Sequence, residues 1–186
     1  KGYKFFRVSF LLPMMMAPVA ISYVIGKMIF SETFGPLNDI LFRLDLPLFL
    51  WGTSSIKSML LIMIIDAWTN IPFFILVLLA SLEAIPTDIY EAATVDGASG
   101  WQRFRKITLP LLIPVSITTI TIRALNAFQI IDVIRVVTGG GPGNSTESAT
   151  LFAYDLGIKG QDIAYAATVS FLLLIIILIF IFLIRF

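Results

Sequence analysis

Long apolar stretches alternate with short polar segments along the chain. An α-helix rises ~1.5 Å per residue, so about 20 mainly apolar residues cross the hydrocarbon core of a bilayer. Four stretches reach that length, and no internal repeat or low-complexity linker separates them. The pattern predicts an all-α, polytopic transmembrane helical bundle that forms one domain over residues 1–186, with spans at residues 5–30, 58–82, 109–137 and 164–184.

The composition supports a multi-pass membrane protein in contact with lipid. The chain is 58% hydrophobic and 13% charged, and its mean hydropathy is +0.96. It has neither cysteine nor histidine, which argues against disulfides, Cys/His metal sites and nucleophiles that use an imidazole base. An intramembrane hydrolase therefore lacks support, and we expect no enzyme. The net charge of +1 gives no reason to expect nucleic-acid binding.

The basic residues predict the orientation, because short loops rich in Lys and Arg stay in the cytoplasm. The polar segment at residues 83–108 is expected on the cytoplasmic side, and residues 31–57 and 138–163 form outer loops. Lys27, Arg123 and Arg135 fall inside the predicted spans. The remaining bases divide into seven on the cytoplasmic side (Lys1, Lys4, Arg7, Arg103, Arg105, Lys106, Arg185) and three on the outer side (Arg43, Lys57, Lys159).

The cytoplasmic segment contains the polar sequence EAATVDGASGWQRFRKITLP. Asp88 and Glu91 have the spacing of a helix start, as do Ser99 and Gln102, and Gly97 between them is suited to end the first helix. We therefore expect two short helices. They could lie on lipid headgroups as an amphipathic element, or the two alanines beside a glutamate could fit a groove in a partner protein.

The spacing within this segment resembles a family signature. Glu-Ala-Ala, three residues, Gly, nine residues, Ile, one residue and Leu-Pro is the pattern of the permease subunits of binding-protein-dependent ABC importers. The chain is similar at every defined position, and these are Glu91, Ala92, Ala93, Gly97, Ile107, Leu109 and Pro110. In that family the motif is the coupling helix, which docks on a cytoplasmic ATPase. The resemblance implies ATPase coupling through Glu91, Ala92, Ala93 and Gly97.

A second stretch resembles the carbohydrate importers of the maltose and glycerol-phosphate type. FQIIDVIRVVTGGGPGNST, from Phe128 to Thr146, is similar to the first of their two paired permeases. The resemblance implies a type I importer permease fold whose two upstream spans are missing from this chain. Arg135 departs from the family, which usually has an aromatic residue near that position, so this base could serve a particular substrate or partner.

The resemblance also implies the surroundings of the protein. It implies a second permease subunit, a dimer of ATPase subunits that bind ATP and Mg, an extracytoplasmic solute-binding protein and a sugar substrate. The chain itself would hold no cofactor or metal. The location would be the cytoplasmic (inner) membrane of a bacterium or archaeon. The outer loop with Gly139, Gly140, Gly141 and Pro142 is either a mobile turn or a site for binding-protein docking or gating.

Polar residues within the second and third spans form a further candidate site. Counted at ~1.5 Å per residue, Asp66, Asn70, Arg123, Asn126 and Gln129 lie ~12–21 Å below the outer ends of the spans. Charges at that depth must face the bundle interior. They could form a helix-to-helix ion pair or hydrogen bond. Alternatively, a stripe of Asn70, Arg123, Asn126 and Gln129, with Phe128 as an aromatic platform, could line a substrate pathway.

An alternative function uses the same intramembrane charges. Asp66, Arg123 and Asp132 could carry protons or sodium in a secondary transporter driven by an ion gradient. Such a transporter needs no coupling loop, so the cytoplasmic motif favours the ATP-driven importer.

Overall fold

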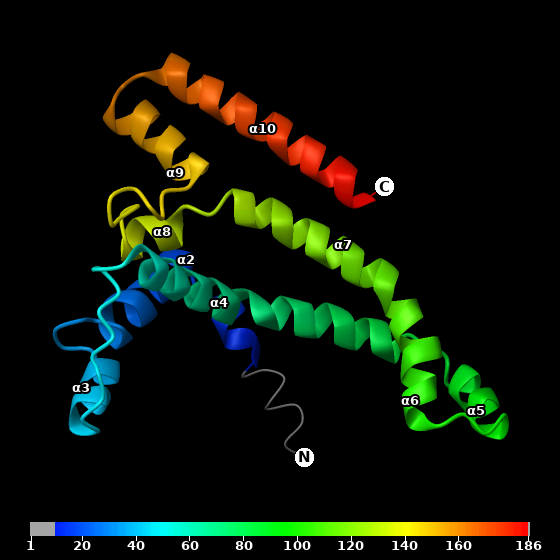
Figure 1. Cartoon of the computed structure of the whole chain (residues 1–186). Helices are drawn as coiled ribbons and strands as arrows, with labels where there is room; N and C mark the ends of the chain where they lie inside the picture. Colours follow the sequence, from blue (N-terminus) through cyan, green and yellow to red (C-terminus); the bar gives the residue numbers. More distant parts are fainter. Residues whose placement is uncertain (1–9, 186) are drawn as a thin grey trace.

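Three long helices dominate the structure, a computed structural model that describes residues 10–185. They are α4 (Ser55–Glu83), α7 (Leu109–Phe128) and α10 (Ile163–Arg185), and no strand occurs among the described residues. Figure 1 shows α4 and α7 side by side, with α10 beyond α7. Each long helix runs opposite to the one before it, as successive membrane crossings must.

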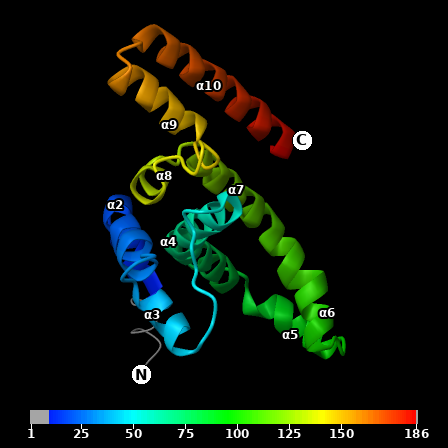
Figure 2. The same cartoon turned by 60° about the vertical axis from the view of Figure 1, so that its left-hand side comes forward.

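Shorter helices join the long ones at two opposite ends. At the α5 end, α5 (Thr87–Val95), α6 (Gly100–Arg103) and a π-helical segment (Phe104–Thr108) connect α4 to α7. At the α8 end, α8, α9 and another π-helical segment connect α7 to α10, and the N-terminal helices pack nearby (Figures 1 and 2). Their bounds are α2 (Pro18–Ile21), a π-helical segment (Ser22–Ile29), α3 (Pro36–Arg43), α8 (Asp132–Val137), α9 (Ala149–Tyr154) and a π-helical segment (Asp155–Lys159).

Three helices among the described residues are long and apolar enough to cross a membrane: Ser55–Glu83, Gly100–Phe128 and Ile163–Ile184. They correspond to the second, third and fourth predicted spans. The third begins before the predicted residue 109, because α6 and the following π-helical segment continue directly into α7.

The third predicted span ends earlier than expected. We predicted one helix over residues 109–137, but α7 stops at Phe128, residues 129–131 are not helical, and α8 is separate. Two side-chain hydroxyls from further along the chain bond to the backbone at this break. The Thr150 hydroxyl donates to the carbonyl of Phe128 at 2.8 Å, and the Ser148 hydroxyl donates to that of Ile130 at 2.8 Å. Carbonyls without helical partners are thereby satisfied by the fold itself.

The first predicted span is also not one helix. Residues 5–9 lie outside the described residues, as do Lys1, Lys4 and Arg7. Residues 10–15 are helical, and a new helix begins at Pro18 after Ala17 in an extended conformation, with ψ of 134°. Proline has no N–H to donate and disfavours helical geometry in the residue before it. The longest apolar helix here, Pro18–Ile29, falls short of a full crossing.

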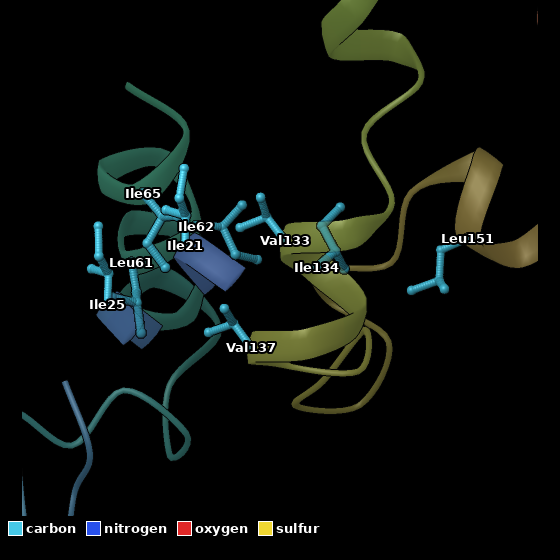
Figure 3. Close-up of a cluster of buried hydrophobic side chains, with 9 residues drawn as sticks. All are labelled: Ile21, Ile25, Leu61, Ile62, Ile65, Val133, Ile134, Val137 and Leu151. Atoms are coloured by element: carbon cyan, nitrogen blue, oxygen red, sulfur yellow. The ribbon is translucent and has the colours of Figure 1, made fainter. Parts of the chain in front are cut away.

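A compact hydrophobic core lies at the α8 end (Figure 3). It joins α2 and the following π-helical segment to α4, α8 and α9. In contrast, residues 163–184 of α10, those whose burial the structure describes, include no buried residue, so the sides of this helix are free for lipid or other protein subunits. The core residues are Ile21, Ile25, Leu61, Ile62, Ile65, Val133, Ile134, Val137 and Leu151.

Buried polar groups fix the loop before α4. The Asn38 side chain accepts a hydrogen bond from the Phe49 amide at 2.8 Å and donates to the carbonyls of Phe49 and Glu32. The Trp51 indole N–H donates to the Phe30 carbonyl at 2.8 Å. These bonds satisfy backbone groups that would otherwise be buried without partners, and they tie the loop to the core.

Gly26 permits the closest approach in the core and gives the first prediction. A Cβ at this position would lie 2.6 Å from Cγ2 of Val137 and 3.3 Å from Cδ1 of Ile65. We expect Gly26→Ala to lower the free energy of unfolding by about 1–3 kcal/mol, the usual cost of overpacking. Thermal unfolding of the purified protein in detergent measures this loss.

Two further variants make the measurement specific. Adding Val137→Ala removes the methyl that the new Cβ would meet, so Gly26→Ala should cost less in that background. Gly100→Ala is the matched control, because nothing lies within 4 Å of a Cβ at Gly100. Unchanged stability in Gly26→Ala would contradict the packing described here.

Candidate functional site

The polar segment between α4 and α7 forms one of the two expected short helices, α5; the second helix start at Ser99 is present, but that helix continues through α6 into α7 as one helix over Gly100–Phe128. The capping box at the second helix start is confirmed: the Ser99 hydroxyl accepts from the Gln102 amide at 3.3 Å, and the Gln102 side chain accepts from the Ser99 amide at 2.8 Å. The predicted Asp88 cap is wrong. Helix α5 begins at Thr87 after Pro86 and has no side-chain cap. Asp88 instead places its carboxylate in the first turn of α5, where the positive end of the helix dipole stabilises the negative charge.

Gly97 ends α5 by adopting the left-handed conformation, with φ of +74°. Its amide donates to the Thr94 carbonyl at 3.0 Å, and the Ala98 amide donates to the Ala93 carbonyl at 2.9 Å. This is the hydrogen-bond pattern of a Schellman C-cap. A Cβ at Gly97 would meet nothing within 4 Å, so the backbone conformation, rather than lack of space, explains the glycine.

Two side-chain hydrogen bonds hold α5 against the helix that follows it. The Tyr90 and Thr108 hydroxyls are 2.8 Å apart, and Arg103 Nη1 donates to the Thr94 hydroxyl at 2.8 Å. The hairpin is thus fixed to the start of α7. Movement of α5 would be passed to the long helix through these contacts.

The predicted coupling residues lie on the accessible side of this hairpin. Glu91, Ala92 and Gly97 are exposed, and Ala93 is half-buried. Figure 1 shows α5 and α6 at the far end of the long helices from α8. Glu91 has no side-chain hydrogen bond or ion pair with the rest of the chain over the residues described. The hairpin therefore presents a carboxylate and small side chains that are free to contact another protein.

A polar cleft of about 180 Å³ lies where α4 and α7 meet the α8 end. It brings together four of the five residues predicted for the pathway: Asn70, Arg123, Asn126 and Gln129. Asp66 and Asp132 from the alternative function lie in the same cleft. The remaining lining residues are Pro18, Thr69, Ile130, Ile131 and Val133.

An ion pair between Asp66 and Arg123 crosses the cleft. Arg123 Nη2 donates to Asp66 Oδ2, and the side-chain exposures are 17% for Arg123 and 27% for Asp66. Asn70 Nδ2 donates to Asp66 Oδ1 at 3.2 Å and to the Asp66 carbonyl at 2.8 Å. The helix-to-helix ion pair is therefore present, and it joins α4 to α7. It coexists with the polar cleft, so the two interpretations of the polar stripe are not exclusive.

Phe128 does not take the place we predicted for it. Its ring packs edge-to-face against Phe180 of α10, with centroids 5.3 Å apart, and it does not line the cleft. Phe128 follows Asn126 by two residues, which is about 200° around the helix, so its ring faces away from the stripe of Arg123 and Asn126 and toward α10.

Two polar residues that line the cleft, Thr69 and Asp132, are absent from the predicted substrate pathway. Thr69 lies three residues after Asp66 and so shares its helical face, which could have placed it in the cleft. The sequence pattern suggests Asp132 only as an ion-coupling group. Its position depends on the break in α7, for which no proline or glycine gives a signal.

The glycine-rich loop is well ordered by hydrogen bonds. Thr146 is 2% exposed, and its hydroxyl lies 2.8 Å from both the Thr138 hydroxyl and the Gly141 carbonyl. Gly139 and Gly140 have φ of 62° and 95°, which favour glycine. Gly139 is exposed, whereas Gly141 and Pro142 are half-buried. These hydrogen bonds define the shape of the loop, and its role as a mobile turn or as a docking or gating site remains a prediction.

The fold and these sites define a class of protein: a polytopic helical membrane protein whose spans are joined by an exposed helical hairpin. Residues 2–186 match the family described as "Binding-protein-dependent transport system inner membrane component", and the chain belongs to this family. The match confirms the family inferred from the motif that runs from Glu91 to Pro110.

Several relatives carry names from sugar transport. The chain is 39% identical over 180 residues to the trehalose/maltose transport system permease protein MalF of Thermococcus litoralis, which covers 97% of the chain and 60% of that protein. It is 34% identical to the sulfoquinovosyl glycerol permease SmoG of Agrobacterium fabrum, over 88% of the chain and 53% of the relative. It is 32% identical to the sn-glycerol-3-phosphate permease UgpA of the same organism, over 96% and 60%. The chain thus spans little more than half the length of these relatives.

Solved structures share the fold. A bacterial ABC transporter involved in the import of the acidic polysaccharide alginate superposes with a TM-score of 0.85, at 23% identity, over 100% of this chain and 65% of that one. The alginate transporter in complex with a periplasmic protein bound to alginate pentasaccharide gives a TM-score of 0.82 over 98% of this chain and 64% of that one, also at 23% identity. The type I importer permease fold expected from the sequence is thereby confirmed.

The Asp66–Arg123 pair yields a second prediction. Asp66→Asn leaves the Arg123 charge without its ion-pair partner at a site where its side chain is only 17% exposed. We expect a loss of about 2 kcal/mol in unfolding free energy, less than the ~3–5 kcal/mol of a fully buried pair because both side chains keep some exposure. The double variant Asp66→Asn/Arg123→Gln should be less destabilised than Asp66→Asn alone. Thermal unfolding in detergent compares the wild type, Asp66→Asn, Arg123→Gln and the double variant.

An exposed pair serves as the control for this cycle. Arg43 and Asp39 pair at 2.9 Å with side-chain exposures of 75% and 55%. Asp39→Asn should therefore cost less than about 1 kcal/mol. Additive effects of the two changes at Asp66 and Arg123 would show that their pairing contributes nothing.

Proposed function

We propose that this chain is part of a permease subunit of an ATP-driven ABC importer for a carbohydrate, located in the cytoplasmic membrane of a bacterium or archaeon. The observation that carries the proposal is the exposed α5 hairpin with Glu91, Ala92 and Gly97, set between two long spans in a chain that matches the permease family from end to end. The names of the relatives support sugars and related solutes as the substrates.

In the proposed mechanism α5 docks in a groove of a separate ATPase subunit. ATP, with Mg, binds to the ATPase dimer, and this chain performs no reaction of its own. Closure of the dimer moves α5. The hydrogen bonds of Tyr90 and Arg103 then pass the movement to α7, and the ion pair between α7 and α4 keeps the two spans together.

The partners at the other end complete the proposed cycle. A second permease would close the pathway, of which the cleft with Asn70, Arg123, Asn126 and Gln129 forms one wall. An extracytoplasmic binding protein would release the sugar there. The loop from Gly139 to Pro142 is the proposed docking or gating surface, supported by its ordered hydrogen bonds and by its place at the α8 end.

Changing the coupling helix tests this function. Glu91→Lys reverses the charge of the one carboxylate among the motif residues of α5. We expect ATP-dependent sugar uptake and co-purification of the ATPase both to fall at least about ten-fold, equivalent to ~1.4 kcal/mol. The measurement is uptake by membrane vesicles that contain the whole importer. Asp39→Lys, an equal charge change near the α8 end, should leave both unchanged.

Two substitutions at Gly97 test whether uptake depends on the left-handed turn at the end of α5. Asn tolerates positive φ and a β-branched residue does not, so Gly97→Asn should retain most uptake and Gly97→Val should lose it. Normal uptake and ATPase retention in both Glu91→Lys and Gly97→Val would show that the hairpin is not the coupling element. Uptake that persists in vesicles depleted of ATP would support the ion-gradient alternative instead.

A further inference from the structure

The cleft contains two groups of polar side chains that differ in how they are paired. Asp66, Asn70 and Arg123 bond to one another. Asn126, Gln129 and Asp132 line the same cleft, yet their side chains form no hydrogen bond or ion pair within the part of the chain that the structure describes. Asn126 and Gln129 are exposed and Asp132 is half-buried, so this second group is available to a solute.

The charges in the cleft do not cancel. Asp66 and Arg123 neutralise each other as an ion pair, which leaves the Asp132 carboxylate as the remaining charge among the lining residues. The nearest base along α8, Arg135, does not line the cleft; its guanidinium carbon lies 4.4 Å from the centre of the Tyr154 ring. The described lining therefore carries a net charge of −1, from two carboxylates and one guanidinium.

The free groups favour one chemical class of solute. Amides donate and accept hydrogen bonds, and a carboxylate accepts them, so sugar hydroxyls can bond to all three side chains. A carboxylate or phosphate on the solute would instead bring a second negative charge next to Asp132. At ~30 Å³ per water, a cleft of about 180 Å³ holds roughly six water molecules, which is comparable with the space taken by one sugar ring.

We propose that this cleft admits uncharged, hydroxyl-rich solutes and rejects anionic ones, and that Asp132 is the residue that discriminates between them. The inference rests on the proposed function because it names the substrate class of that pathway. The fold alone does not decide between neutral and anionic solutes, because a transporter of this fold imports an acidic polysaccharide. The proposal makes that choice.

A cysteine placed in the cleft can report its charge. The chain has no cysteine of its own, and Gln129 is exposed in the cleft. Gln129→Cys, in the complete importer in membrane vesicles, is treated with a cationic and with an anionic methanethiosulfonate reagent, and labelling of this chain is followed by mass spectrometry. Relative to a free small thiol, the cationic reagent should react roughly ten-fold faster than the anionic one, as expected for a charged cleft.

Variants of Asp132 assign the effect to one side chain. Asp132→Asn should bring the two labelling rates to within about two-fold of each other, whereas Asp132→Glu should keep the preference for the cation. Asp45→Asn is the matched control, because it removes a carboxylate from an exposed loop outside the cleft and asparagine tolerates the φ of 53° found there. A preference for the anionic reagent, or a cation preference that survives Asp132→Asn, would overturn the proposal.

A matched pair of solutes tests the class directly. Glucose and glucuronate differ by one carboxylate, and at equal concentration and ionic strength glucose should slow the labelling of Gln129→Cys more than glucuronate does. Equal or stronger protection by glucuronate, or no protection by either, contradicts the assignment. An importer that takes up no carbohydrate but still shows the Asp132-dependent cation preference would contradict the proposed function and leave the charge of the cleft as inferred.

Discussion

The backbone carbonyls of Phe128 and Ile130 lie where a membrane helix stops, and the structure around the cleft depends on their hydrogen bonds. In an apolar surrounding a carbonyl without a partner costs several kcal/mol, roughly 2–7 depending on the reference state. The hydroxyls of Thr150 and Ser148 provide the partners here. Because both come from the start of α9, the same bonds hold the connection to α10 against the end of α7. The break allows α8 to turn aside and bring Asp132 into the cleft.

Charge pairing accounts for how polar residues can occupy the same region. Arg123 and Asp66 stand on different long helices, and neither could lie there alone at low cost. Their ion pair makes α4 and α7 a unit, and the α5 hairpin joins that unit at its other end. The hairpin and the cleft are thus joined through two helices, with side-chain contacts at both ends. This is the geometric basis for the transport mechanism proposed above.

Apolar side chains are buried at the α8 end and exposed along the long helices, as expected for a protein that contacts other subunits. Among the described residues, the buried core lies at the α8 end, whereas residues 163–184 of α10 include no buried residue. Where no core lies between long apolar helices, their side chains contact lipid or neighbouring subunits instead. The ordered core supports the cleft and the glycine-rich loop, while the exposed hairpin at the α5 end stands apart from it.

The sequence by itself determined the features that depend on local pattern. Apolar length located α4, α7 and α10, and motif spacing identified the hairpin and its family. Ser99 and Gln102 predicted their capping box, because such bonds join residues three apart. Three features came only from the tertiary structure: the helix break after Phe128, the packing of the Phe128 ring against Phe180, and the lack of a side-chain partner for Asp132 among the described residues. Each depends on partners distant in the chain, as Thr150 is from Phe128. The hydrophobic pattern cannot predict which distant hydroxyl will bond to a given carbonyl.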